Sequence, residues 1–95
     1  MLSLPPAVRI FVATTPTNMH LSFDRLAGLA RDVIGQDPLS GHLFAFFNRP
    51  ADRVKILFWD RSGFCLWYKR LERGGFHLPR AGAATLELDA ADLML

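Results

Sequence analysis

Hydrophobic residues along the chain recur with two different periods, and each period predicts a different kind of element. Residues 8–13 are rich in β-branched and aromatic side chains and alternate around Arg9, which predicts a strand. From Ser22 to Ile34 apolar residues recur every three or four positions, which predicts a helix. Ser22 is a suitable N-cap for this helix and Gly35 a natural stop.

Three more strands are expected in the middle of the chain. Residues 43–47 are wholly apolar between turn residues, as in a central strand buried on both faces. Residues 53–59 alternate, which places Val54, Ile56 and Phe58 on one face and Arg53 and Lys55 on the other. Residues 64–71 fit either a strand or a helical stripe, and their aromatic content and the preceding turn favour the strand.

The turn at residues 60–63 decides how the last two of these strands pair. An Asp first and a Gly last favour a three-residue loop with a bulge at Gly63, which would set Lys55 opposite Lys69. A two-residue loop would instead set Lys55 opposite Tyr68. Directly opposed like charges cost stability, so the first register would be tolerated for a reason other than the fold.

The remaining segments are short. Gly74 and Gly75 turn the chain, residues 76–79 are expected to add a short edge strand, and residues 81–85 form a flexible connection. Residues 86–88 are expected to be extended, and Asp89 with Asp92 resembles the start of a capped helix. The chain is therefore predicted to be a single α+β domain over residues 1–95. Its small antiparallel sheet has three to five strands, and one main helix packs on one face.

Positive charge and aromatic bulk are concentrated in the same part of the chain. The formal net charge is only +2, yet residues 49–80 carry eight basic and three acidic side chains, a balance of +5. The segment from residue 81 to the C-terminus has a balance of −3. Residues 40–79 hold both tryptophans and the single tyrosine. Such a segment is typical either of a surface that binds nucleic acid or a protein partner, or of a solvated sheet face above an aromatic core. Its candidate contact residues are Arg49, Arg53, Lys55, Trp67, Tyr68, Lys69, Arg70 and Arg73.

Catalytic chemistry is not indicated by any spacing in the chain. The three histidines are scattered, and no pair of cysteines exists to bind a metal ion. Cys65 lies between apolar neighbours, as a small core residue does. Asp52 and Asp60 flank one strand, but both occupy turns, where Asp is favoured for backbone reasons. We therefore expect no enzymatic activity, no cofactor and no metal site. The lone cysteine and the lack of a signal or membrane segment predict a cytoplasmic protein.

Within this middle segment the sequence resembles a known family, the TnpB accessory proteins encoded by the second open reading frame of IS66-class bacterial insertion sequences. The run YKRLERG, following W-D and G-F, is the most specific match. The matching residues are Asp37-Pro38, residues 40–44, Phe46, Asn48-Arg49, residues 52–57, Trp59-Asp60, Gly63-Phe64, Leu66, residues 68–74, Phe76 and Pro79.

The resemblance implies a non-catalytic helper of DNA transposition, encoded beside a separate transposase that carries the catalytic residues and metal ions. Its expected partners are that transposase and possibly DNA. The alternatives are a pure protein-interaction module without DNA contact and the remnant of a defective element. Family members tend to carry basic residues near His20 and Leu21 and often at Phe47, so part of their positive surface is missing here. They usually continue past Leu95 with a leucine-rich segment, so this chain is expected to lack the C-terminal extension.

Overall fold

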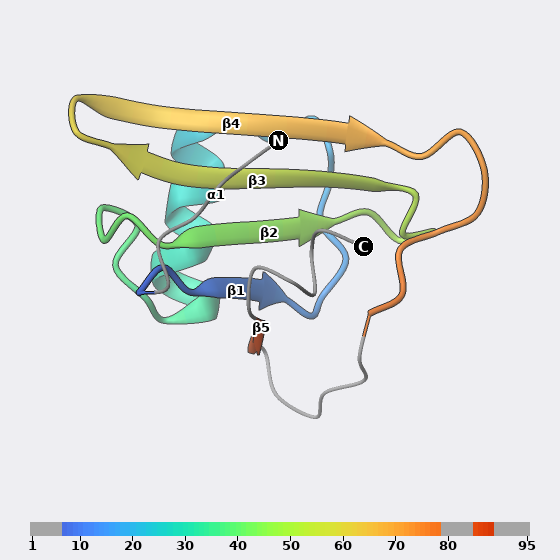
Figure 1. Ribbon diagram of the computed structural model, residues 1–95, viewed down its shortest axis with the longest axis horizontal. Helices are drawn as coiled ribbons and strands as arrows, with labels where there is room; N and C mark the ends of the chain where they lie inside the picture. The colour runs from blue at the N-terminus through green and yellow to red at the C-terminus, as the bar shows by residue number, and fades with distance from the viewer. Residues whose placement is uncertain (1–6, 79–84, 89–95) are drawn as a thin grey trace.

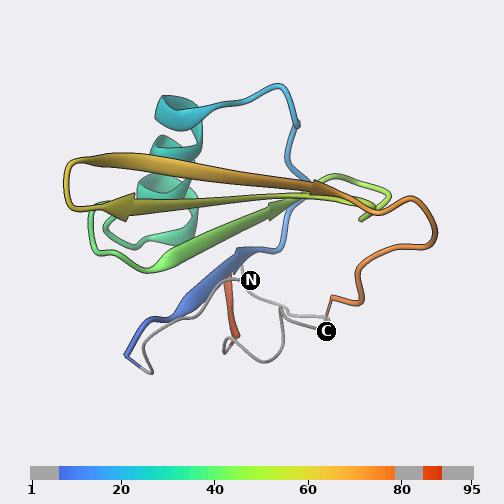
Figure 2. The ribbon, with the colours of Figure 1, turned by 45° about the horizontal axis from the view of Figure 1, so that its top comes forward.

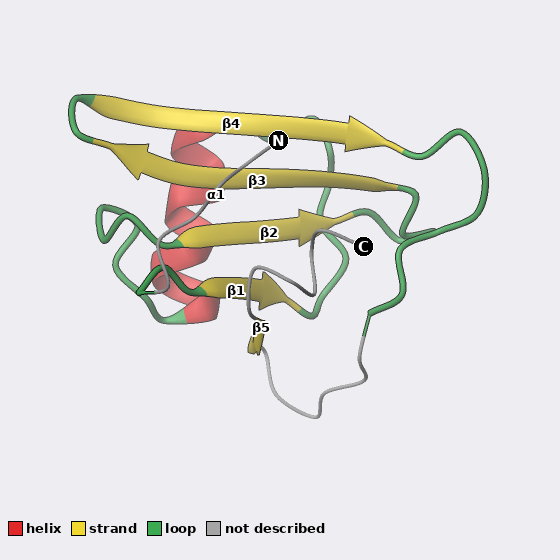
Figure 3. Ribbon diagram, in the orientation of Figure 1, coloured by secondary structure: helices red, strands yellow, loops and turns green. Residues whose placement is uncertain are grey.

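A five-stranded sheet with helical cover on one face forms the described part of the protein. The computed structural model describes residues 7–78 and 85–88. Figures 1 and 3 show the sheet, whose strands follow the order β4-β3-β2-β1-β5. The predicted α+β class is therefore confirmed. The elements in chain order are β1 (Ile10–Ala13), α1 (Phe23–Leu29), the π-helical turn η1 (Ala30–Ile34), β2 (Leu43–Phe47), β3 (Arg53–Asp60), β4 (Gly63–Arg70) and β5 (Thr85–Leu88).

The sheet is mixed, which corrects the expectation of a purely antiparallel one. β1 and β2 run parallel, while the other neighbouring strands are antiparallel. Parallel neighbours need a long crossover connection, and the helical segment between β1 and β2 provides it. β4 lies at one edge of the sheet, so the segment that the resemblance matches most specifically runs along this edge.

The predicted helix is present and changes character near its end. Ser22 occupies the N-cap position, but its side chain makes no capping hydrogen bond. Its carbonyl oxygen accepts the first helical bond, 2.9 Å from the Leu26 nitrogen. The last turn is π-helical and ends at Gly35, whose φ of 78° is the left-handed conformation expected of a glycine C-cap. α1 packs on β3 and β4 and η1 packs on β1, so the helix crosses one face of the sheet (Figure 2).

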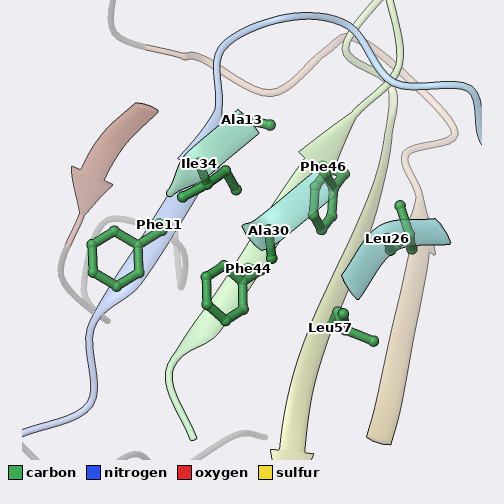
Figure 4. Close-up of a cluster of buried hydrophobic side chains, with 8 residues drawn as sticks. All are labelled: Phe11, Ala13, Leu26, Ala30, Ile34, Phe44, Phe46 and Leu57. Atoms are coloured by element: carbon green, nitrogen blue, oxygen red, sulfur yellow. The ribbon is translucent and has the colours of Figure 1, made fainter. Parts of the chain in front are cut away.

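Both faces of the central strands are buried, which explains the unbroken apolar run at residues 43–47. On the helix side, aromatic rings of β1 and β2 meet aliphatic side chains of the helix (Figure 4). Their close packing contributes to the hydrophobic stabilisation of the fold. The helix-side core consists of Phe11, Ala13, Leu26, Ala30, Ile34, Phe44, Phe46 and Leu57. The opposite core consists of Ile10, Val12, Leu43, Ala45, Phe47, Val54 and Ile56, with Phe58 packed against it.

The β3–β4 hairpin adopts the two-residue loop, so the favoured three-residue register is wrong. Asp60 pairs with Gly63, and Lys55 accordingly faces Tyr68. Arg61 takes a positive φ of 49°, which a two-residue hairpin loop requires at its first position. In this register Arg53 faces Arg70, and Val54 faces Lys69. A like-charge pair therefore exists in the sheet, between two arginines instead of two lysines.

The segments after β4 match the predictions from the sequence only in part. Residues 76–78 form no strand. Instead the Phe76 ring packs edge-on against Phe47, with 5.4 Å between the ring centroids, so this segment serves the core. The extended piece predicted at residues 86–88 is confirmed, as part of β5. The flexible connection, except for its last residue Thr85, and the capped helix start at Asp89 lie outside the described residues.

Candidate nucleic-acid or partner interface

Two turns meet at one end of the sheet and bring basic residues together. The Leu71 N–H donates to the Asp52 carbonyl at 2.8 Å, and the Phe76 N–H donates to the Ala51 carbonyl at 2.6 Å. These bonds tie the β2–β3 turn to the segment after β4, at the right-hand end of the sheet in Figure 1. We call this surface the basic end. It carries Arg49, Arg53, Lys69, Arg70 and Arg73.

Asn48 organises the turn that presents the first two of these arginines. Its side-chain oxygen accepts the N–H groups of Asp52 and Arg53, both at 3.0 Å. Its amide nitrogen donates to the Asp52 carboxylate at 2.6 Å. The turn is therefore fixed by side-chain hydrogen bonds, in the manner typical of Asn at the start of a turn. Asp52 is used in this scaffold and does not form an ion pair with an arginine of the basic end.

Lys55 does not belong to the exposed surface, in contrast to the expectation from the alternating pattern. It retains only 7% of its accessible surface, and its ammonium donates to the Leu21 carbonyl at 2.8 Å. The same nitrogen lies 4.9 Å from the centroid of the Tyr68 ring. The polar face of β3 is the helix face, and the chain leading into α1 covers this lysine. Its role in the structure is to attach that chain to the sheet.

Lys55 is therefore expected to contribute to stability. We predict that Lys55→Met lowers the free energy of unfolding by about 1.5–3 kcal/mol, because a buried hydrogen bond from a charged group is lost. Lys69→Met, at an exposed position of the neighbouring strand, should change it by less than about 0.5 kcal/mol. Urea denaturation of both variants measures the difference. Equal stability of the two variants would show that the Lys55 contact is not stabilising.

The two exposed aromatic residues of β4 lie on opposite faces of the sheet. Tyr68 is 47% exposed on the helix side, and its hydroxyl accepts a hydrogen bond from Arg53 Nη1 at 3.1 Å. Trp67 is 40% exposed on the other side, with Lys69 Nζ 6.0 Å from its ring centroid. Each ring is thus accompanied by a cation, and the two rings flank the edge of the sheet. They cannot form one flat platform.

Most of the positive charge at the basic end is uncompensated. The Arg70 Nη2 atom pairs with the Glu72 carboxylate at 3.0 Å, and both side chains are exposed. The hydrogen bond that Arg70 donates to the Glu72 carboxylate, and then the negative charge of that carboxylate, raise the pKa of Arg70 above its ordinary value. An exposed pair of this kind contributes little stability. Five basic side chains stand against Asp52 and Glu72, a balance of +3. Arg49 and Arg73 form no ion pair with any residue that the structure describes.

The residues considered for catalysis lie apart. Asp52 and Asp60 are at opposite ends of β3, about 25 Å from one another, so they cannot share a metal ion. Cys65 is a free, half-buried thiol on β4. Within residues 7–78 and 85–88, no group of three or more His, Cys, Asp or Glu side chains is placed to hold a metal ion.

Two features of the basic end were missed by the sequence reasoning. The opposed Arg53 and Arg70 follow from the two-residue loop, which was considered but not favoured. The bracing of the turn by Asn48 was not anticipated, although Asn four residues before Asp in a turn is a signal for it.

Comparison with known proteins places this small α+β protein among those of mobile genetic elements. A model of the family described as IS66 Orf2 like protein, TnpB, matches residues 8–95, and the chain belongs to this family. Two similar proteins come from Sinorhizobium fredii (strain NBRC 101917 / NGR234). Uncharacterized protein y4hO is 37% identical over 93 residues, which are 98% of this chain and 81% of the relative. Uncharacterized protein y4jC is 30% identical over 95 residues, 100% of this chain and 81% of the relative. No solved structure is significantly similar.

Among the described residues, no helix has both the length and the apolar character needed to cross a membrane. The helical segment of 12 residues from Phe23 to Ile34 is far shorter than the roughly 20 residues that a spanning helix requires.

Proposed function

We propose that this protein is a non-catalytic accessory factor for transposition of an insertion sequence and that it acts by binding nucleic acid through the basic end. The observation that carries the proposal is the gathering of Arg49, Arg53, Lys69, Arg70 and Arg73 at the end of the sheet where the β2–β3 turn is hydrogen-bonded to the segment after β4. Family membership supplies the context of transposition. The element's transposase is the expected protein partner and the carrier of the chemistry.

The composition of the basic end favours a phosphate backbone as its ligand. Lysine and arginine side chains release counterions from nucleic acid when they contact phosphates, and this supplies sequence-independent affinity. Exposed Tyr68 and Trp67 add rings on which unpaired bases can stack.

A transposition assay in cells tests the proposed role. An element that carries Lys69→Glu and Arg73→Glu in this protein should transpose at least about tenfold less often, because two cations of the basic end become repulsive to phosphate. The matched control is Arg31→Glu with Arg61→Glu, which changes the net charge equally on the helix and at the far hairpin turn. Equal transposition by both double variants would contradict the proposal.

The same assay tests whether the protein has a catalytic role of its own. Cys65→Ala and Asp60→Ala variants should transpose at the wild-type frequency, since neither side chain has a catalytic role in the proposal. Cys65→Ala removes the only thiol, and Asp60→Ala removes an exposed carboxylate. Loss of transposition with normal expression and folding of either variant would indicate a chemical role.

A protein-interaction module without DNA contact is the second candidate, and the edge strand favours it. β4 is eight residues long, lies at the edge of the sheet and carries no proline. Such an edge offers unpaired backbone groups to a partner strand, and exposed Trp67 and Tyr68 are typical interface residues. On this alternative the transposase co-purifies with the protein after nuclease treatment, and Trp67→Ala weakens the association. Co-purification that disappears with nuclease treatment would favour the nucleic-acid proposal instead.

A further inference from the structure

Arg53 and Arg70 face each other across the first pair of the β3–β4 ladder, and we propose that they bind one phosphodiester group of nucleic acid together with the Tyr68 hydroxyl. This inference rests on the proposed function and identifies the place where the backbone is held. The site is defined by Arg53, Tyr68 and Arg70, all on the helix face of the hairpin.

The paired register makes the two arginines a destabilising contact in the protein alone. Residues directly opposite in an antiparallel pair have Cβ atoms about 5 Å apart on the same face, and like charges there repel. Arg53 has a neutral phenol as its hydrogen-bond acceptor, so that bond does not offset its charge. Glu72 compensates Arg70 only through a solvent-exposed pair. A bound anion between the two guanidinium groups would turn the repulsion into attraction.

Tyr68 supplies a third donor to the same place. Its oxygen accepts from Arg53 Nη1 at 3.1 Å, so its own O–H is directed elsewhere and is able to donate to an anion. Buried Lys55 lies against the ring at 4.9 Å and holds it in position from behind. The phenol is therefore positioned between a fixed lysine and a partly exposed arginine.

A phosphodiester matches these donors better than a second carboxylate. Planar guanidinium groups bind phosphate oxygens in a bidentate manner, and two of them with one hydroxyl match a tetrahedral group with several acceptor sites. Arg73 follows Arg70 by three positions, so a neighbouring phosphate of the same strand would also meet a cation, whereas Lys69 faces Val54 on the opposite side of the sheet. Glu72 competes for Arg70, so its carboxylate must move aside when phosphate binds.

Thermal unfolding in chloride and in inorganic phosphate at equal, low ionic strength tests the site. In chloride, Arg70→Gln should raise Tm by about 2 °C, because the repulsion with Arg53 is removed. Addition of phosphate should raise the Tm of the wild type and leave Arg70→Gln and Arg53→Gln nearly unchanged. Arg73→Gln, which removes the same charge without a facing arginine, should respond to phosphate like the wild type. Glu72→Gln should respond at a lower phosphate concentration.

The outcomes distinguish a failure of the proposed phosphate site from a failure of the proposed function. Phosphate also stabilises proteins by exclusion from their surface, and that effect is common to all variants. If Arg70→Gln and Arg53→Gln respond to phosphate as strongly as the wild type, the site is refuted, while salt-dependent binding of a DNA duplex would leave the proposed function standing. If the wild type responds to phosphate through this pair but binds neither a DNA duplex nor single-stranded DNA, both the assignment to nucleic acid and the proposed function are refuted.

Discussion

A Phe44→Ala variant is expected to lose about 3–5 kcal/mol of unfolding free energy, a large part of the total of about 5–15 kcal/mol that domains of this size possess. Phe44 is a fully buried residue of β2, and its ring stacks on Phe11 with 5.8 Å between centroids. The rings of Phe44 and Phe46 and the side chains of the helix fill one space (Figure 4), so removal of a ring leaves a cavity that a sheet interior cannot close. Urea denaturation followed by circular dichroism measures the loss.

Phe23→Ala is the matched control for this change. Phe23 is 42% exposed at the start of α1, so the same chemical deletion removes less buried surface there than at Phe44. Its cost should be about 1–2 kcal/mol. A similar loss in both variants would mean that the two-sided core around β2 is not what stabilises the fold.

The second large effect is expected on binding. Lys69→Glu with Arg73→Glu should weaken affinity for a DNA duplex by about 10- to 100-fold at 0.1 M salt, because each lost phosphate contact removes about one counterion-release contribution. Fluorescence anisotropy with a labelled duplex measures the dissociation constant. Arg31→Glu with Arg61→Glu changes the total charge by the same amount away from the basic end. If this control weakens binding equally, only the net charge matters and the basic end is not the contact surface.

Local patterning was sufficient to predict most elements of the fold. The helix between Ser22 and Gly35 follows from the period of its apolar residues, and the buried strand at residues 43–47 follows from its composition. The parallel pairing of β1 with β2 does not follow from either segment, because it depends on how the intervening helix crosses the sheet. The pairing of strands that are distant in the sequence therefore could not be predicted from the pattern of each segment alone.

The hairpin register shows how a single residue changes the predicted site. One residue more or less in the loop moves every partner of β3 by one position and exchanges the faces that meet. The favoured loop paired Lys55 with Lys69, and the observed loop pairs Arg53 with Arg70. The sequence signal, Asp followed three residues later by Gly, is compatible with both loops. The positive φ of Arg61 is the detail that separates them, and arginine does not signal it.

The candidate site was predictable as a set of residues and only partly as a surface. Arg49, Arg53, Arg70 and Arg73 come together because the β2–β3 turn and the segment after β4 meet at the end of β3 and β4 that lies opposite their hairpin loop. Lys55 carries the same charge as Arg53 and lies on the same strand, yet the chain that enters α1 covers it. Lys55 is buried by the segment around Leu21, 34 positions earlier in the sequence, and the alternation of residues along β3 does not predict this contact.

The salt dependence of DNA binding reveals whether the basic end contacts phosphate groups. The dissociation constant of the wild-type protein for a DNA duplex is measured at several salt concentrations between about 50 and 200 mM. Three to five phosphate contacts at the basic end predict a slope of about −3 to −4.5 for the logarithm of the binding constant against the logarithm of salt concentration. An affinity that does not change with salt, or no binding at the lowest concentration, would contradict the account.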